Sequence, residues 1–137
     1  MSTEGLSTFP SSYGQRETVD RLEAEIKKRG MTVFARVDHT AGAAEAGMHL
    51  RPTELLIFGN AKGGTPLMQA NQAIGIDLPL KALIYEDAFG KVCVSYNDPS
   101  WLARRHGLGP SASQGVNAMT AMLHSVAKTA TGSSEAS

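Results

Sequence analysis

The chain has 137 residues, of which 42% are hydrophobic and 19% are charged, and these values fit one soluble globular domain that is long enough to bury a core. Thirteen basic and thirteen acidic residues give a formal net charge of zero, which argues against a nucleic-acid binder or a protein of anionic membranes. The single cysteine, Cys93, excludes an internal disulfide, a zinc site built on paired cysteines and a CxxC redox motif.

The beginning of the sequence predicts neither an export signal nor a membrane anchor. Residues 1–15 lack the basic start and the apolar centre of a secretory signal, and no apolar run approaches the ~20 residues of a membrane span. We therefore expect a cytoplasmic protein without a membrane partner. Because residues 1–15 are rich in Ser, Thr and Gly, we predict a flexible N-terminal lead-in that could end in a short strand.

A helix and a strand follow this lead-in. Val19, Leu22 and Ile26 recur at spacings of three and four, which is typical of a helix with one buried face. Gly30 can adopt the left-handed conformation that ends a helix. Apolar and polar residues then alternate over 31–38, which predicts a strand.

The middle of the chain predicts a short helix, a buried strand and a glycine-rich loop. Residues 41–46 are rich in alanine and precede a glycine, as in a short helix. Residues 53–58 include four consecutive apolar side chains, which suits a strand covered on both faces. A loop over 59–64 should then lead into a helix that Thr65 caps, with Pro66 at its first position and its end near Ile74.

The last third predicts a hairpin followed by two helices. Strands over 80–86 and 91–96 flank a turn. Asp98 and Pro99 then begin a helix that ends near residue 107. A C-terminal helix is predicted over 109–128 and a disordered tail over 129–137. These elements predict an α/β (α+β) fold, a single compact domain with a mixed β-sheet and helices packed on it.

Several short motifs occur in a characteristic order along the chain. They are Lys28-Arg29-Gly30, Val37-Asp38-His39, Phe58-Gly59-Asn60-Ala61-Lys62-Gly63-Gly64-Thr65-Pro66-Leu67-Met68, Asp77-Leu78-Pro79-Leu80, Tyr85-Glu86-Asp87 and Ser95-Tyr96-Asn97-Asp98-Pro99. As a set they resemble the domain of unknown function family 302 over residues 16–108. The resemblance implies a compact α/β domain that tends to form a homodimer, and it implies neither a reaction nor a cofactor. The helix over 109–128 lies outside the resemblance.

The glycine-rich segment resembles a phosphate-binding loop in its spacing. A Walker A loop, however, needs Lys and then Ser or Thr directly after the second spaced glycine. Here Thr65 and Pro66 follow that glycine, and Lys62 lies inside the loop. Hydrolysis of a nucleoside triphosphate is therefore not expected.

A weaker binding role remains for the same segment. Backbone amides of Gly63 and Gly64 could hold an anion, with Lys62 above it and with Asn60 and Thr65 as hydrogen-bond partners. The alternative is a structural turn with a capping threonine.

Two further positions could carry chemistry. His39 follows a strand and could serve as a general base, a metal ligand or a haem ligand, or it could be an ordinary loop residue. Glu86 and Asp87 end a strand and could act as acid and base, or they could cap a turn. The four histidines show no metal-ligand spacing, so no protein-built metal site is expected. Cys93 alternates with valines and is expected to be a buried structural thiol.

These residues support three hypotheses. We favour a ligand-binding or sensing homodimer whose pocket lies at the end of the 53–58 strand, with His39, Asn60, Lys62 and Thr65 at its rim. The ligand would be an anion or another small molecule, not a nucleic acid. The second hypothesis is an enzyme that uses His39 with Glu86 or Asp87 as an acid–base pair. The third is a structural interaction domain that docks through the 109–128 helix.

Overall fold

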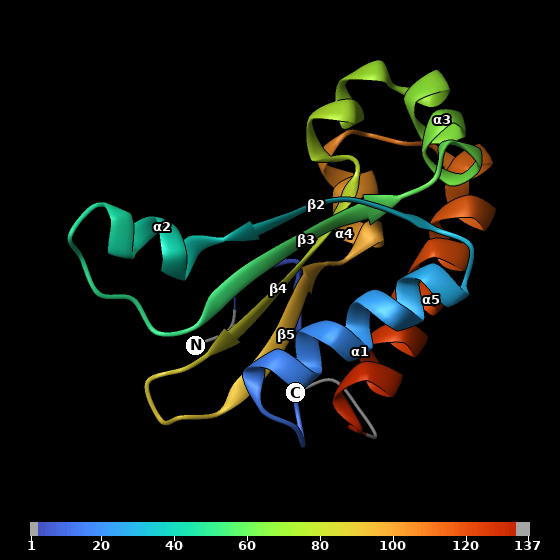
Figure 1. The fold of residues 1–137 in the computed structure, drawn as a ribbon. Helices are drawn as coiled ribbons and strands as arrows, with labels where there is room; N and C mark the ends of the chain where they lie inside the picture. The colour runs from blue at the N-terminus through green and yellow to red at the C-terminus, as the bar shows by residue number, and fades with distance from the viewer. Residues whose placement is uncertain (1–2, 134–137) are drawn as a thin grey trace.

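The computed structural model describes residues 3–133. Five strands form one open sheet in the order β1-β5-β4-β3-β2, and α1 and α5 lie side by side over one of its faces (Figure 1). The prediction of a single α+β domain with helices packed on a sheet is confirmed. All four strand pairs are antiparallel, so the sheet is not mixed: β2 to β5 form a meander, and β1 joins its edge beside β5.

The helices and strands have the following bounds in chain order: β1 (Leu6–Pro10), α1 (Gln15–Lys28), β2 (Thr32–Asp38), α2 (His39–Glu45), β3 (Thr53–Gly59), α3 (Ala61–Ala70), the 3-10 helix η1 (Gln72–Asp77), β4 (Leu80–Glu86), β5 (Val92–Asn97), α4 (Pro99–Arg105), the 3-10 helix η2 (Pro110–Ala112) and α5 (Ser113–Thr131). None of the helices found among residues 3–133 is long and apolar enough to cross a membrane.

The main hydrophobic core lies between the sheet and the two long helices. The predicted stripe of α1, formed by Val19, Leu22 and Ile26, is buried there. On α5 the core includes Leu123 and Val126. Each such side chain contributes about 1.5–3 kcal/mol when it leaves water, so α5 is part of the domain and not an appendage to it.

The strand β3 is covered on one face only. Leu56 and Phe58 are fully buried against the helices, whereas Leu55 and Ile57 point to the opposite face and are half-buried. The prediction that both faces are covered is therefore wrong for this chain, because an antiparallel meander places its helices on a single face. That second face of the sheet is open over residues 3–133.

The start of α3 differs from the prediction. Asn60, not Thr65, caps the helix, because its Oδ1 accepts the Gly63 amide at 2.8 Å. The segment predicted as a loop is therefore helical from Ala61, and Pro66 lies inside the helix. Buried Leu67 anchors α3, so tertiary packing overrides the poor helix propensity of two glycines and a proline.

The two ends of the chain compare differently with the prediction. The short strand considered at the end of the 1–15 lead-in is β1, which pairs with β5 from Leu6 to Pro10. At the other end α5 continues to Thr131, three residues beyond the predicted end of the helix. The remainder of the tail predicted over 129–137 includes residues 134–137, which lie outside the described residues, as do residues 1–2.

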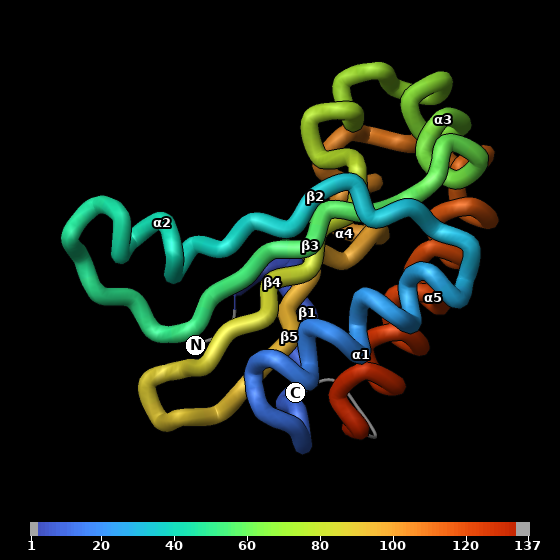
Figure 2. The backbone as a smooth tube through the Cα atoms, in the orientation of Figure 1, coloured from blue at the N-terminus to red at the C-terminus, as the bar shows by residue number. Residues whose placement is uncertain are grey.

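The hairpin of β2 and β3 carries α2 away from the body of the domain. Figure 2 traces this arm, and α2 lies at the opposite end of the sheet from α3. No residue of α2 is buried. The two ends of the hairpin therefore have different surroundings, and only the α3 end lies close to α5.

Candidate functional site

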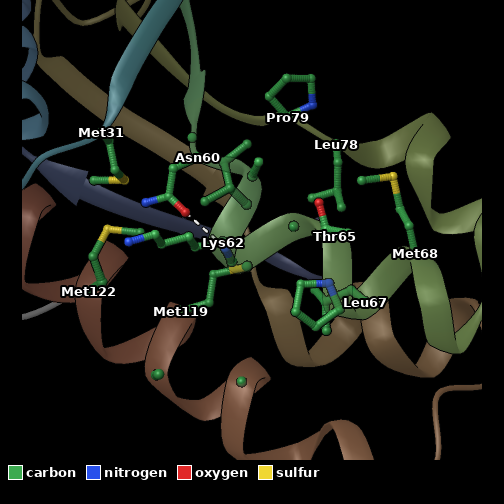
Figure 3. Close-up of a pocket in the computed structure, with 18 of the residues that line it drawn as sticks. Met31, Asn60, Lys62, Thr65, Leu67, Met68, Leu78, Pro79, Met119 and Met122 are labelled. Carbon is green, nitrogen blue, oxygen red and sulfur yellow. Dashed lines mark hydrogen bonds between the residues drawn. The ribbon is translucent and has the colours of Figure 1, made fainter.

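A pocket of about 710 Å³ lies between α3 and α5, where β3 passes into α3 (Figure 3). Its volume falls within the roughly 300–1,000 Å³ of typical small-molecule sites. Its lining residues come from β2, β3, α3, β4, η2, α5 and the segments that join these elements or follow α1: Arg29, Met31, Phe34, Gly59, Asn60, Ala61, Lys62, Gly63, Gly64, Thr65, Pro66, Leu67, Met68, Ala70, Leu78, Pro79, Leu80, Ser111, Ala112, Gly115, Ala118, Met119 and Met122.

The walls of the pocket are mainly apolar. Four of the six methionines of the chain line it, namely Met31, Met68, Met119 and Met122. Met119 packs both against the main core and against the smaller hydrophobic cluster beneath α3. The pocket therefore lies at the boundary between two packed regions, and flexible thioether side chains form much of its surface.

Two cationic side chains line the pocket. Lys62 is exposed and has no ion pair or hydrogen bond within residues 3–133. The Arg29 guanidinium donates to the Ser125 hydroxyl at 2.7 Å and lies 3.7 Å from a Glu25 carboxylate oxygen. No acidic side chain is among the described lining residues, so the charge facing the pocket is positive.

The N-terminus of α3 adds unpaired amides at the same place. The Asn60 side chain accepts the Gly63 amide, and the Asn60 carbonyl accepts the Gly64 amide at 3.1 Å. The amides of Ala61 and Lys62 have no acceptor within the described part of the chain, as is usual in the first turn of a helix. These donors and the positive end of the helix dipole favour an anion.

Gly63 and Gly64 are not required by the backbone. Neither has a positive φ, and an added Cβ at Gly64 would meet its nearest atoms, in Leu78 and Met68, at 3.7 and 3.8 Å. Glycine inside a helix costs about 1 kcal/mol relative to alanine. At Gly63 an added Cβ would lie 3.4 Å from the Asn60 Oδ1 that caps the helix. The two glycines thus weaken α3, and they leave the wall of the pocket open where a ligand could approach the backbone.

The predicted site residues separate into two groups. Asn60, Lys62, Gly63, Gly64 and Thr65 all line the pocket, as a group at the start of α3. His39 does not line it.

The strand register explains the position of His39. Thr32 lies opposite Gly59, whereas Asp38 lies opposite Glu54. The length of β2, roughly 20 Å at about 3.3 Å per residue, therefore lies between His39 and the glycine-rich segment. His39 belongs to a different end of the sheet and has no part in this pocket.

Of the two carboxylates considered for acid–base work, that of Asp87 has structural partners. Asp87 Oδ1 accepts the amides of Phe89 and Lys91, both at 2.9 Å, as a turn-capping aspartate does. Neither Asp87 nor Glu86 lines the pocket.

Cys93 is buried, and burial raises the pKa of its thiol, an effect to which the nearby Asp87 carboxylate adds. In residues 3–133 no three His, Cys, Asp or Glu side chains gather as a metal site would require.

Sequence reasoning missed the methionines and Arg29. Met31, Met68 and the pair Met119 and Met122 belong to segments far apart in the chain, and no spacing rule connects them. The packing of α3 against α5, beside the start of β2, brings them to one cavity. The available signal was compositional, since Met-rich surfaces are common where proteins bind varied apolar ligands.

Known proteins provide an independent comparison. The chain matches curated relatives named "Fluoride-specific ion channel FluC 1" from Brucella suis biovar 1 (strain 1330) and "Fluoride-specific ion channel FluC 2" from Brucella melitensis biotype 1 (strain ATCC 23456 / CCUG 17765 / NCTC 10094 / 16M). Each is 52% identical over 128 residues, which is 93% of this chain but 50% and 47% of the two relatives. The chain thus spans about half the length of the curated relatives it matches.

A solved structure shares the fold. It is described as "Crystal structure of uncharacterized conserved protein DUF302 from Bacillus stearothermophilus", with a TM-score of 0.83, 22% identity, and coverage of 93% of this chain and 99% of that one. The family described as "Domain of unknown function DUF302" matches residues 7–126. The match includes β1 from Ser7 and most of α5, so the helix predicted over 109–128 lies within the family domain as far as Val126. The chain therefore belongs to the DUF302 family of domains of unknown function.

Proposed function

We propose that this domain binds a small anionic molecule in the pocket between α3 and α5. The observation that carries the proposal is the charge of the pocket: Lys62 and Arg29 line it, and no acidic side chain of the described residues does. The amides of Ala61 and Lys62 add hydrogen-bond donors at the same end. An anion there would accept hydrogen bonds from the amides that the first turn of α3 leaves without an acceptor.

The cost of Gly63 and Gly64 supports the same proposal. A stable helix in this position would favour alanine by about 1 kcal/mol at each site, and alanine has room at Gly64. A ligand that approaches the backbone closely accounts for glycine here, because a side chain would occupy its space.

Binding is favoured over catalysis by the residues that the pocket offers. Among the described lining residues there is no His, Asp, Glu, Cys or Tyr. These are the side chains that most often transfer protons or attack substrates at neutral pH. The acid–base pair suggested by the sequence, His39 with Glu86 or Asp87, lies outside this pocket.

The test is a ligand screen on the purified chain. Phosphate, a nucleoside monophosphate, acetate and haem represent anions of different size, and fluoride is added because the Brucella relatives are named for it. We expect at least one anion to raise the unfolding temperature and to bind in calorimetry. Native mass spectrometry of protein purified from its own cells should show a bound small molecule.

A matched pair of lysine variants locates the binding. Lys62→Met should weaken anion binding about tenfold, as expected for loss of one charge-assisted contact. Lys28→Met removes an exposed lysine that does not line the pocket and should leave binding unchanged. The proposal is wrong if no anion binds and native spectra contain only the bare chain, or if both variants behave alike.

We also propose that the domain acts as a homodimer. The open face of the sheet carries half-buried Leu55, Ile57 and Leu83. Among the described residues that line the shallow hollow on that face, Lys81 alone is charged. Interfaces between proteins are depleted in charge at their centre in just this way. A second copy seated there would cover β3 on both faces.

A further inference from the structure

We infer that the ligand of this pocket is an amphipathic anion, a molecule with one carboxylate or phosphate group and an extended apolar body. The inference rests on the proposed function, because it assumes that an anion binds. It adds that the remainder of the ligand is apolar and extended. Three observations carry it: the polarity of the walls, the placement of the charges and the size of the pocket.

The charges lie toward one end of the pocket. Figure 3 shows the Lys62 side chain reaching toward Met31 and Met122, while Leu78 and Met68 lie on the other side of the start of α3. Arg29 lines the pocket and is tied to Ser125 of α5. An anionic group bound at Lys62 and Arg29 would therefore leave a long apolar stretch of the pocket beyond it.

The apolar stretch is suited to hydrocarbon. Leu67 is almost fully buried at 4% exposure, and Met68, Leu78 and Met119 are half-buried around it. Methionine side chains have three rotatable bonds and a polarisable sulfur, so they adapt to apolar ligands of irregular shape. A hydrophilic anion would make no use of these walls.

The volume of the pocket is much larger than a bare ion needs. Water takes about 30 Å³ per molecule in the liquid, and an inorganic anion is only a few times larger. Most of the 710 Å³ would then hold water against apolar walls, which is unfavourable. An apolar body displaces this water, and each buried methylene strengthens binding by about fourfold.

The experiment is a chain-length series of carboxylates, measured by calorimetry below their micelle concentrations. Acetate, hexanoate, octanoate and decanoate share one head group, and decanol supplies the chain without the charge. We expect the dissociation constant to fall by about fourfold per added methylene until the pocket is full. Decanol should bind more weakly than decanoate by about tenfold, since it lacks the charged contact.

Two variants separate the two halves of the ligand. Lys62→Met should weaken decanoate about tenfold and leave decanol unchanged. Met68→Gln, a polar replacement of similar length at a half-buried position of the apolar stretch, should weaken decanoate and decanol alike and leave acetate unchanged. A folded variant is verified by its circular dichroism and unfolding temperature before its binding is interpreted.

The outcomes distinguish this inference from the proposed function. If acetate or phosphate binds as tightly as decanoate, the anion site stands and the amphipathic ligand is wrong. If no anion in either screen binds, both are wrong. If the chain sediments with vesicles of anionic phosphatidylglycerol but binds no free decanoate, the pocket does not enclose a single amphiphile and the inference is overturned in favour of a lipid surface.

Discussion

At the scale of single residues, we expect a substitution of Gly64 to change stability and ligand affinity in opposite directions. Gly64→Ala places a Cβ 3.7 Å from Leu78 and 3.8 Å from Met68, which is ordinary contact. We expect the free energy of unfolding to rise by about 0.5–1 kcal/mol, because alanine favours the helix, while ligand affinity falls because the new methyl group narrows the pocket. Urea denaturation and calorimetry measure the two effects.

Gly42→Ala is the matched control. Gly42 lies inside α2, has an ordinary φ and has no atom within 4 Å of an added Cβ. It should give a similar gain in stability and no change in binding. If Gly64→Ala binds ligands as the parent does, the glycine has no role in the pocket.

Tyr96 gives a prediction about pH. Burial raises the pKa of its phenol to about 12, and the Asp98 carboxylate contributes to the same shift. An unfolded tyrosine ionises near pH 10. Between about pH 10 and 12 the folded state then holds one proton more than the unfolded state. The contribution of the Tyr96 phenol to the free energy of unfolding is therefore fully present below pH 10 and falls as the pH rises through this range.

The comparison with Tyr96→Phe isolates this effect. The variant lacks the ionisable group, so its unfolding free energy should fall less between pH 10 and 12 than that of the parent. Lysines and the other tyrosines titrate in both proteins and cancel in the difference. Equal slopes in the two proteins would contradict the raised pKa.

At the scale of secondary-structure elements, Asp77 ties η1 to the end of α4. Its carboxylate lies 2.5 Å from His106 Nε2 and accepts from the Arg105 guanidinium at 2.9 Å. The side chains of Asp77 and His106 are only 14% and 10% exposed, whereas that of Arg105 is 52% exposed. The His106 contact should therefore contribute most of the stabilisation, because exposed ion pairs are weak.

Asp77→Asn should destabilise the domain by about 1–3 kcal/mol, as expected for a largely buried, charge-assisted contact. Arg105→Gln should cost less than about 1 kcal/mol. Chemical denaturation measures both values, and hydrogen exchange should show the loss of protection in η1 and α4. Equal costs for the two variants would mean that the Arg105 pair carries the contact.

The elements also show what local sequence rules can predict. Periodicity located α1, whose buried side chains recur at helical spacing, and β2, whose residues alternate between half-buried and exposed. The turn between β4 and β5 located their hairpin. The start of α3 was misplaced, since Thr65 and Pro66 form a stronger local signal than Asn60 followed by two glycines. Packing of Leu67 decides in favour of Asn60, and packing is not visible locally.

The candidate site shows the same limit. Polar residues at the end of β3 were sufficient to locate Asn60 and Lys62 at a pocket. His39 was assigned to the same place because each residue follows a strand, yet antiparallel strands end at opposite edges of a sheet. Met119 and Met122 complete the pocket from α5, a contact that depends on the tertiary fold.

At the scale of the whole molecule, no part of residues 3–133 covers the second face of the sheet or packs α2 into a core. Leu55 and Ile57 are half-buried on the open face, and Leu6 is 37% exposed at its edge. The seven residues of α2 bury no side chain, although a helix of this length depends on packing for its stability. Association of two copies through this face would bury the apolar strands, and the projecting α2 arm is long enough to reach beyond the sheet of its own subunit (Figure 1).

The prediction is that Leu55→Glu converts a dimer into a monomer. A glutamate at the centre of the apolar face would be buried without a partner in the dimer, which is strongly unfavourable, whereas in the monomer it meets water. Light scattering coupled to size exclusion should give twice the chain mass for the parent and a single chain mass for the variant. Ile76→Lys introduces a charge at an exposed apolar residue of η1 and should leave the dimer intact. A parent chain that is monomeric at every concentration tested would rule out this interface, and the pocket between α3 and α5 would then act within a single subunit.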